Sequence, residues 1–191
     1  LAAVIGLGMA VKWSMIVLLA VSLLFFLLIR RYDWLITLVA LLPLAGLLYT
    51  GCYAAFFADG KSLGDFAQLQ AAMVRRWTVV AADTQQPPFT IWRILFTGYC
   101  NYGDYVTSNW RWYWPVVGAG AGVGLLYSLW KRAPLYWLCL LWFFGYMLFF
   151  SAGPTWDRYI LPAFPGALIV IVGMLKDGGR RLLYTYVRSE A

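Results

Sequence analysis

The chain has 191 residues, of which 63% are apolar and only 12% are charged, whereas a soluble domain averages about 45–50% apolar and about 25% charged residues. Together with the mean hydropathy of +0.72, this composition excludes an ordinary soluble domain and predicts an integral membrane protein. The net charge of +7 does not indicate nucleic-acid binding, because the basic residues occur in small groups between apolar runs, where they are typical topology signals.

Five apolar runs are long enough to be membrane spans, since a helix crosses the hydrocarbon core in about 20 residues. They comprise residues 13–30, 34–51, 113–130, 134–151 and 158–175. Residues 1–11 are similar to half of a sixth span, and no signal peptide is indicated. The predicted fold is therefore all-α, a polytopic membrane helical bundle of about five spans plus an N-terminal half-span.

The short connections between these runs predict the orientation of the chain. Positively charged residues in short loops stay in the cytoplasm, whereas long loops cross the membrane largely regardless of charge. The basic residues that fall on one side under the five-span model are Arg30, Arg31, Lys131, Arg132, Lys176, Arg180 and Arg181. We therefore expect transmembrane helices in 1–51 and 113–176, an extracytoplasmic segment in 52–112 and a cytoplasmic tail in 177–191.

The extracytoplasmic segment has internal order. Its stretch "GDFAQLQAAMVRRW" places Phe66, Leu69, Met73 and Trp77 on one helical face, which predicts a helix lying along the membrane interface or a helix packed against the rest of the segment. "TQQPPFTIWR" follows as an expected extended piece. The aromatic belt Trp110, Trp112, Tyr113 and Trp114 then marks re-entry into the bilayer.

The residues available for chemistry are limited. No His is present, so the commonest zinc ligand and general base are missing, and the three cysteines show no metal spacing. We therefore expect no metal. Cys52 and Cys100 are both predicted to face outward, where an oxidising compartment would permit a disulfide. Asp83 and Asp104 are outward carboxylates that could act as general bases, but neither has a recognisable partner, and the alternative is that both are simply solvated.

"GAGAGVG" (118–124) superficially resembles a phosphate-binding glycine loop, but that loop requires a preceding strand. Gly118 and Gly122 are four residues apart, as are Gly120 and Gly124. This spacing lets membrane helices approach closely. We therefore predict that the stretch serves helix packing.

Two places combine charge with apolar surroundings. Lys12 lies between apolar segments, where an ammonium group is either interfacial or functional.

Asp157, Arg158 and Tyr159 lie at the predicted outer mouth of the last span, before Pro162 and Pro165. Arg and Tyr supply donors that suit a phosphate, and Asp157 would orient the Arg. The alternative is a surface ion pair with Tyr159 as a belt residue.

Two short motifs carry a family resemblance. "DRYILPAFPGALIVIVGML" resembles the "RY-x-LP-x-x-P-x-L" stretch of the polyprenyl-phosphate-dependent glycosyltransferases of the GT-C superfamily, in particular the protein O-mannosyltransferase and aminoarabinose transferase branch. "GLGMAVKWSMIVLL" is similar to a helix junction of the same branch. The order of spans and outward segment agrees over the whole chain.

The resemblance implies a transferase that moves one sugar from a polyprenyl-phosphate donor to a protein or lipid hydroxyl on the extracytoplasmic side. It implies that Tyr159 and Arg158 hold the phosphate of the lipid donor, with Lys12 as a further contributor. The family's catalytic carboxylate lies in an earlier outward loop, and no acidic residue precedes Lys12. The catalytic residue is therefore unassigned, and we expect this chain to be a C-terminal part completed by the missing N-terminal part of the same protein.

The identity of the acceptor stays open, and so do two alternatives to a transferase, a non-catalytic membrane subunit and a transporter segment. The family's protein O-mannosyltransferases carry a His-containing motif in the outward segment, and the absence of His leaves mannose and protein acceptors without support from this chain. A non-catalytic membrane subunit would also lack the catalytic acid. A transporter segment would need more ionisable residues inside its spans than Lys12 alone.

Overall fold

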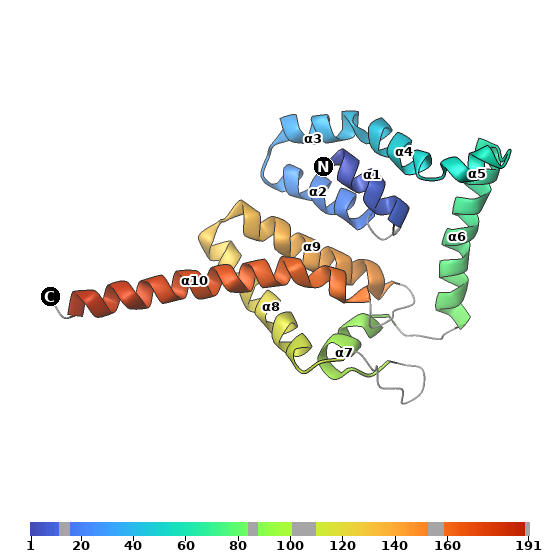
Figure 1. The fold of residues 1–191 in the computed structure, drawn as a ribbon. Coiled ribbons are helices and arrows are strands. Elements are labelled where there is room, and N and C mark those ends of the chain that lie inside the picture. The colour runs from blue at the N-terminus through green and yellow to red at the C-terminus, as the bar shows by residue number, and fades with distance from the viewer. Residues whose placement is uncertain (12–15, 84–87, 101–109, 153–158, 190–191) are drawn as a thin grey trace. The chain divides into compact units, whose positions relative to one another are not determined.

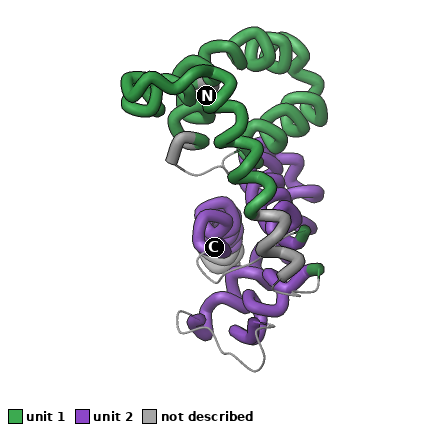
Figure 2. Tube along the Cα trace, turned by 90° about the vertical axis from the view of Figure 1, so that its right-hand side faces the viewer, with its two compact units in different colours: residues 1–88, 152–154 green, residues 89–151, 155–191 purple. Residues whose placement is uncertain are grey.

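The computed structural model describes residues 1–191 except 12–15, 84–87, 101–109, 153–158 and 190–191. Its regular elements are all helical over this part of the chain (Figure 1), so the predicted all-α class is confirmed. The chain divides into two compact units, one of residues 1–88 and 152–154 and the other of residues 89–151 and 155–191 (Figure 2).

The first unit contains six helices in its described residues. In chain order they are α1 (Ala2–Val11), α2 (Ile16–Leu28), α3 (Tyr32–Ala40), α4 (Leu42–Gly51), α5 (Ala54–Ala58) and α6 (Leu63–Asp83). The connection between α2 and α3 falls at the predicted "RRYD", where Arg30 adopts a left-handed backbone conformation with φ 55°. Arg31 then holds Asp33 through two hydrogen bonds, Nε to Oδ1 at 3.1 Å and a terminal guanidinium nitrogen to Oδ2 at 2.9 Å.

A proline interrupts the second predicted span. Helices α3 and α4 follow one another with only Leu41 between them, and Pro43 lies in the first turn of α4. Proline has no amide hydrogen and its ring clashes with the carbonyl four residues earlier, which breaks the helical ladder at this point. Tyr32–Gly51 nevertheless remains one apolar stretch of 20 residues.

Helix α1 packs against α4 through a glycine. A side-chain carbon at Gly6 would clash with the backbone carbonyl oxygen of Ala45, and Ile5, beside it, is 1% exposed. The two helices can approach this closely only because both positions are small. The predicted N-terminal half-span is therefore an ordered helix with a tertiary partner.

The second unit contains the remaining elements. They are α7 (Thr90–Thr97), α8 (Tyr113–Lys131), α9 (Pro134–Ser151), the 3₁₀ turn η3 (Leu161–Ala163) and α10 (Phe164–Ser189). Helix α8 ends at the predicted "KRAP", with Arg132 in a left-handed conformation at φ 51° and Pro134 starting α9. Proline suits a first helical position, whose amide hydrogen has no partner within the helix.

Three helical stretches of the described residues are long and apolar enough to cross a membrane, namely Tyr32–Gly51, Pro134–Ser151 and Leu161–Gly179. They are consistent with a membrane protein. Two of the five predicted spans are not among them. Ile16–Leu28 is apolar but only 13 residues long, and α8 has the predicted position and length but a middle rich in Gly and Ala.

The structure corrects the predicted boundaries in two places. Residues 90–93 of the stretch predicted as extended belong to helix α7, because Thr90, Ile91, Ile94 and Leu95 form a buried helical face. The last span was predicted to begin at residue 158, but its α-helix begins at Phe164. This helix continues through the predicted tail to Ser189.

Glycine packing within the second unit agrees with the prediction at three of four positions. A side-chain carbon added at Gly118 would come within 2.8 Å of Leu95, at Gly120 within 2.6 Å of Ile171, and at Gly124 within 2.7 Å of Val170. Gly122 has open space around it. Helix α8 therefore uses its glycines to approach α7 and α10.

The predicted aromatic belt also requires one correction. Trp112 is 74% exposed, as a belt residue should be, but Trp114 is 1% exposed and lies edge-on to Phe164 at a ring distance of 5.7 Å. Trp114 is thus a core residue. Cys52 is an exposed thiol in the first unit, and Cys100 is a buried thiol in the second.

Helix α6 confirms the helix predicted within residues 52–112 and extends it. Its first turns pack through Phe66, whose ring lies 5.0 Å from that of Tyr53 and 5.9 Å from that of Tyr49. Farther along, Met73 is 43% exposed. The helix is therefore attached at its beginning to the end of α4 and to α5, and exposed in its described middle.

Candidate functional site

The structure describes one of the four residues predicted to form the phosphate site. Tyr159 is half-buried just before η3. Lys12, Asp157 and Arg158 lie outside the described residues. The candidate site is therefore built around Tyr159, the end of α9 and the start of α10, and we call the described residues 150–151 and 159–164 the α9–α10 junction.

The ring of Tyr159 has a fixed partner in α9. It stacks on Phe150 with a ring distance of 4.7 Å and an interplanar angle of 27°. Phe150 is 3% exposed and lies 4.9 Å from the ring of Tyr146, one helical turn earlier on the same face. An aromatic side chain held in this way loses little further freedom when its hydroxyl binds a ligand.

The segment after Tyr159 is also held in place. Ile160 is fully buried, and the indole nitrogen of Trp142 on α9 donates a hydrogen bond to the carbonyl oxygen of Pro162 at 2.8 Å. Helix α10 can then start at Phe164 with Pro165 in its first turn, where a missing amide hydrogen costs least. The start of α10 is thereby fixed relative to α9.

Close packing of the two helices continues into the first turns of α10. A side-chain carbon at Gly166 would clash with the backbone carbonyl oxygen of Cys139. The Trp142 indole and the Gly166 contact both involve α9. The two helices therefore behave as one rigid pair at the junction.

Helix α7 closes the same end of α9. The amide nitrogen of Phe89 donates to the carbonyl oxygen of Ser151 at 3.2 Å, and the indole nitrogen of Trp92 donates to the Ser151 hydroxyl at 2.9 Å. Phe89 reaches this position in a left-handed conformation at φ 67°. These bonds satisfy polar groups that the end of a helix otherwise leaves without partners.

Sequence reasoning missed the contribution of α7 to this site. The signal was present, since Ile91, Ile94 and Leu95 follow the spacing of a helical face, but the two prolines before them favoured an extended interpretation. The hydrogen bond between Trp92 and Ser151 joins residues 59 positions apart. No local pattern predicts a pair this distant in the chain.

The junction supplies donors suited to an anion. The phenol of Tyr159 is a hydroxyl donor on a fixed ring, and the start of α10 carries the positive end of a long helix dipole. In the described part of the chain, no group of three or more His, Cys, Asp or Glu residues is placed to bind a metal. The described chemistry of the junction is therefore that of neutral hydrogen-bond donors in apolar surroundings.

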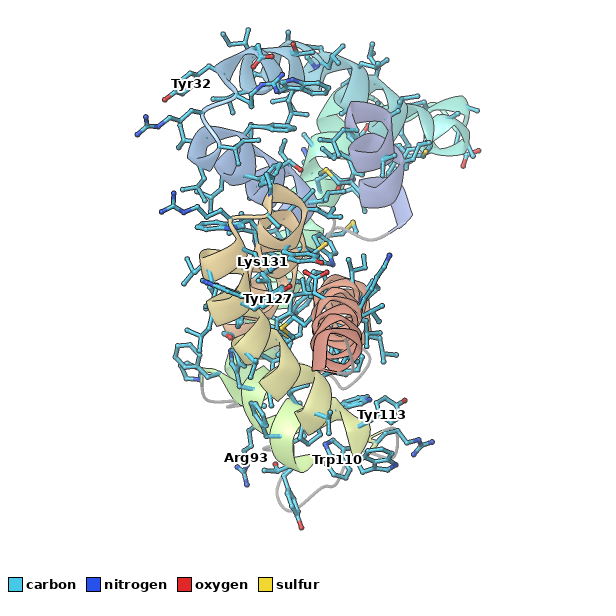
Figure 3. All side chains as sticks on the ribbon, turned by 90° about the vertical axis from the view of Figure 1, so that its left-hand side faces the viewer. Tyr32, Arg93, Trp110, Tyr113, Tyr127 and Lys131 are labelled. Carbon is cyan, nitrogen blue, oxygen red and sulfur yellow. The ribbon has the colours of Figure 1, made fainter. Side chains whose placement is uncertain are left out.

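A second polar cluster lies on α8 and α10 and was not predicted as a unit. Lys131 forms an ion pair with Asp177, Nζ to Oδ2 at 3.2 Å, and the hydroxyl of Tyr127 also donates to Asp177. Figure 3 shows Tyr127 and Lys131 next to one another on α8. We call Tyr127, Lys131 and Asp177 the α8–α10 polar cluster.

Comparisons with known proteins give no assignment: no family model matches the chain, and no curated protein or solved structure matches it.

Proposed function

We propose that this chain is the membrane part of a transferase that moves a sugar from a polyprenyl-phosphate donor to a protein or lipid hydroxyl, and that the α9–α10 junction holds the donor's phosphate. The observation that carries the proposal is the fixed position of Tyr159, half-buried and stacked on Phe150. Arg158 precedes it directly in the sequence and would add a guanidinium group, whose fork of donors suits phosphate oxygens.

The proposed topology has five passes. Tyr32–Gly51, Pro134–Ser151 and Leu161–Gly179 are three of them, with α2 and α8 as the others. The basic connections after α2 and α8 would lie in the cytoplasm by the positive-inside rule, so the junction would face the extracytoplasmic side. Lys12 would contribute to the phosphate site from that side.

The chemistry of the transfer explains why such donors matter. The oxygen of the acceptor hydroxyl forms a bond to the sugar's anomeric carbon, while the bond from that carbon to the phosphate oxygen breaks and its electron pair stays on the phosphate. The acceptor's proton passes to a carboxylate that, by the family resemblance, an N-terminal part of the protein supplies. Hydrogen-bond donors fixed in a site of low dielectric stabilise the charge that develops on the leaving phosphate.

Tyr159→Phe tests the phosphate site in the complete protein. The substitution keeps the ring that stacks on Phe150 and removes only the hydroxyl. We expect affinity for polyprenyl phosphate, measured as a Kd in detergent micelles, to fall about tenfold or more, since a hydrogen bond to a charged group contributes about 1.5–3 kcal/mol. Arg158→Ala should weaken binding at least as much.

The matched control is Tyr113→Phe, which removes a phenol hydroxyl from the start of α8, where Tyr113 is 43% exposed. It should bind polyprenyl phosphate as the unmodified protein does. If Tyr159→Phe and Arg158→Ala both retain the unmodified Kd while folding normally, these residues do not hold the phosphate and the proposal fails.

A further inference from the structure

The end of α8 and the facing part of α10 gather cations on an exposed surface. Lys131 is the last residue of α8 and Arg132 follows it, while Lys176 precedes Asp177 on α10. The ion pair between Lys131 and Asp177 holds the two helices together here. These residues carry three positive charges and Asp177 carries one negative charge, which leaves a surplus of positive charge.

The surplus is carried by Arg132 and Lys176. Both are exposed, and among the described residues neither forms a salt bridge. Lys131 is instead compensated by Asp177, whose carboxylate also accepts from the Tyr127 hydroxyl. The polar cluster therefore acts as a framework, and the two flanking cations remain available to an external anion.

The loop holding Arg132 is short and well defined. Arg132 and Ala133 alone separate α8 from α9, and Arg132 adopts a left-handed conformation at φ 51°. A short loop between two long helices fixes the backbone from which the guanidinium projects, which reduces the backbone entropy lost on binding.

Aromatic side chains at the same end are typical of the depth of lipid headgroups. Trp130 is 62% exposed, and the Lys131 ammonium lies 5.4 Å from the centre of its ring and 5.8 Å from that of the Tyr127 ring. Exposed indole and phenol rings favour the membrane–water interface. The end of the apolar stretch Leu161–Gly179 lies at the same level, because Asp177 on it pairs with Lys131.

We infer that this surface, defined by Trp130, Arg132 and Lys176, binds the headgroup phosphate of an anionic phospholipid. Guanidinium and ammonium groups donate charge-assisted hydrogen bonds to phosphate oxygens, and the exposed indole would lie beside the glycerol and upper acyl chain. An anionic lipid is favoured over a zwitterionic one because it carries no headgroup cation to oppose the surplus charge. The inference requires only that this end of the bundle lies at a membrane surface, and is independent of sugar transfer.

The test compares lipid retention by the full chain and a double variant, Arg132→Asn with Lys176→Gln. Asn tolerates the left-handed conformation at position 132, and both changes leave the polar cluster intact. Each protein is extracted from vesicles of equal parts phosphatidylglycerol and phosphatidylcholine, and bound lipid is counted by native mass spectrometry. The unmodified chain should retain mainly phosphatidylglycerol, and the double variant should bind it roughly 25-fold more weakly, about fivefold per cation.

A matched control removes two cations elsewhere, by Lys61→Gln with Arg76→Gln; both residues are exposed. The control should retain phosphatidylglycerol as the unmodified chain does, and excess inorganic phosphate should not displace the lipid. The inference is overturned if both double variants lose phosphatidylglycerol equally, if the Arg132/Lys176 variant keeps it, or if inorganic phosphate releases it.

Discussion

The two ends of the apolar stretch of α10 are fixed by different physical means. At its start, Tyr159 stacks on Phe150 and the Trp142 indole binds the carbonyl oxygen of Pro162, so packing and neutral hydrogen bonds determine the geometry. Toward its other end, Asp177 bonds to Lys131 and Tyr127, with the side chains of Lys131 and Asp177 about one-third exposed. There, charge determines the contact.

This difference suits the two ends to the different tasks that we propose for them. Buried packing transmits small changes and holds a side chain in one position, which suits a site that must align a reacting phosphate. A partly exposed ion pair is weakened by water and salt and contributes about 0–1 kcal/mol. Such an end suits reversible attraction of a headgroup by charge, without fine alignment.

The largest expected effect comes from a single methyl group added near each end of the apolar stretch Leu161–Gly179. Gly166→Ala would force α10 away from the backbone of Cys139, and overpacking of this kind costs about 1–3 kcal/mol. Gly178→Ala on the same helix meets nothing within 4 Å, and replacing a helical glycine there should stabilise the protein by up to about 1 kcal/mol. Unfolding in mixed detergent–SDS micelles, followed by circular dichroism, measures both changes.

Each glycine variant serves as the control for the other. Equal effects of the two substitutions on the free energy of unfolding would contradict the contrast, because both add the same methyl group to α10 and only Gly166 has a backbone atom in its way.

A smaller effect is expected from two tryptophans on α9. Trp142→Phe removes the hydrogen bond to the Pro162 carbonyl, whose length is 2.8 Å. Trp137→Phe removes a longer one, at 3.2 Å, to the carbonyl of Ser128, which also accepts from the amide nitrogen of Arg132 at 2.8 Å. Because the Ser128 carbonyl keeps a partner, we expect Trp142→Phe to cost about 1 kcal/mol more free energy of unfolding than Trp137→Phe.

The same micelle unfolding experiment measures this pair. The two substitutions remove the same atoms, so the difference between them reports mainly the hydrogen bonds. If Trp137→Phe lowered the free energy of unfolding more than Trp142→Phe, the end of the molecule near Lys131 and Asp177 would depend more on its hydrogen bonds than the start of α10 does.

Sequence patterns predicted the elements whose causes are local. The apolar runs gave the all-α class, and the basic turns at Arg30 and Arg132 fell where a left-handed residue ends a helix. Gly118, Gly120 and Gly124 approach other helices, as the four-residue spacing predicts. In each case, the determining feature lies within a few residues of the chain.

Features that depend on distant partners were not predictable in this way. Trp114 was expected in the interfacial belt, but Phe164, 50 residues later, buries it. The bond from Trp92 to Ser151 and the pairing of Lys131 with Asp177 likewise require knowledge of which helices lie together. For the candidate site, the sequence predicted Tyr159 from its motif, while the stacking that fixes its ring depends on tertiary packing.

The smallest expected effect concerns the start of α6, which extends the comparison to a helix end whose first backbone groups are capped by polar side chains. The Asp65 carboxylate accepts from the Ser62 amide and hydroxyl, both at 2.8 Å, and the Asp65 amide donates to the Ser62 hydroxyl at 3.1 Å. This reciprocal arrangement is a capping box. The Ser62 amide bond is the main cause that lowers the pKa of Asp65, followed by the hydroxyl bond, with Lys61 adding a smaller contribution.

The sign of the pH dependence follows from the lowered pKa of Asp65. The stabilisation is fully present above the carboxyl's unfolded pKa of about 3.9 and is lost as the pH falls through the lower folded pKa. Hydrogen exchange of the Ser62 amide, measured by NMR in micelles, should accelerate over that acidic range relative to its intrinsic rate. Asp65→Asn should remove this transition, whereas Asp59→Asn, on the exposed turn before it, should preserve it. A transition that survives Asp65→Asn would show that another group fixes the start of α6, so a charged cap would no longer distinguish this helix end from the neutral, packed start of α10.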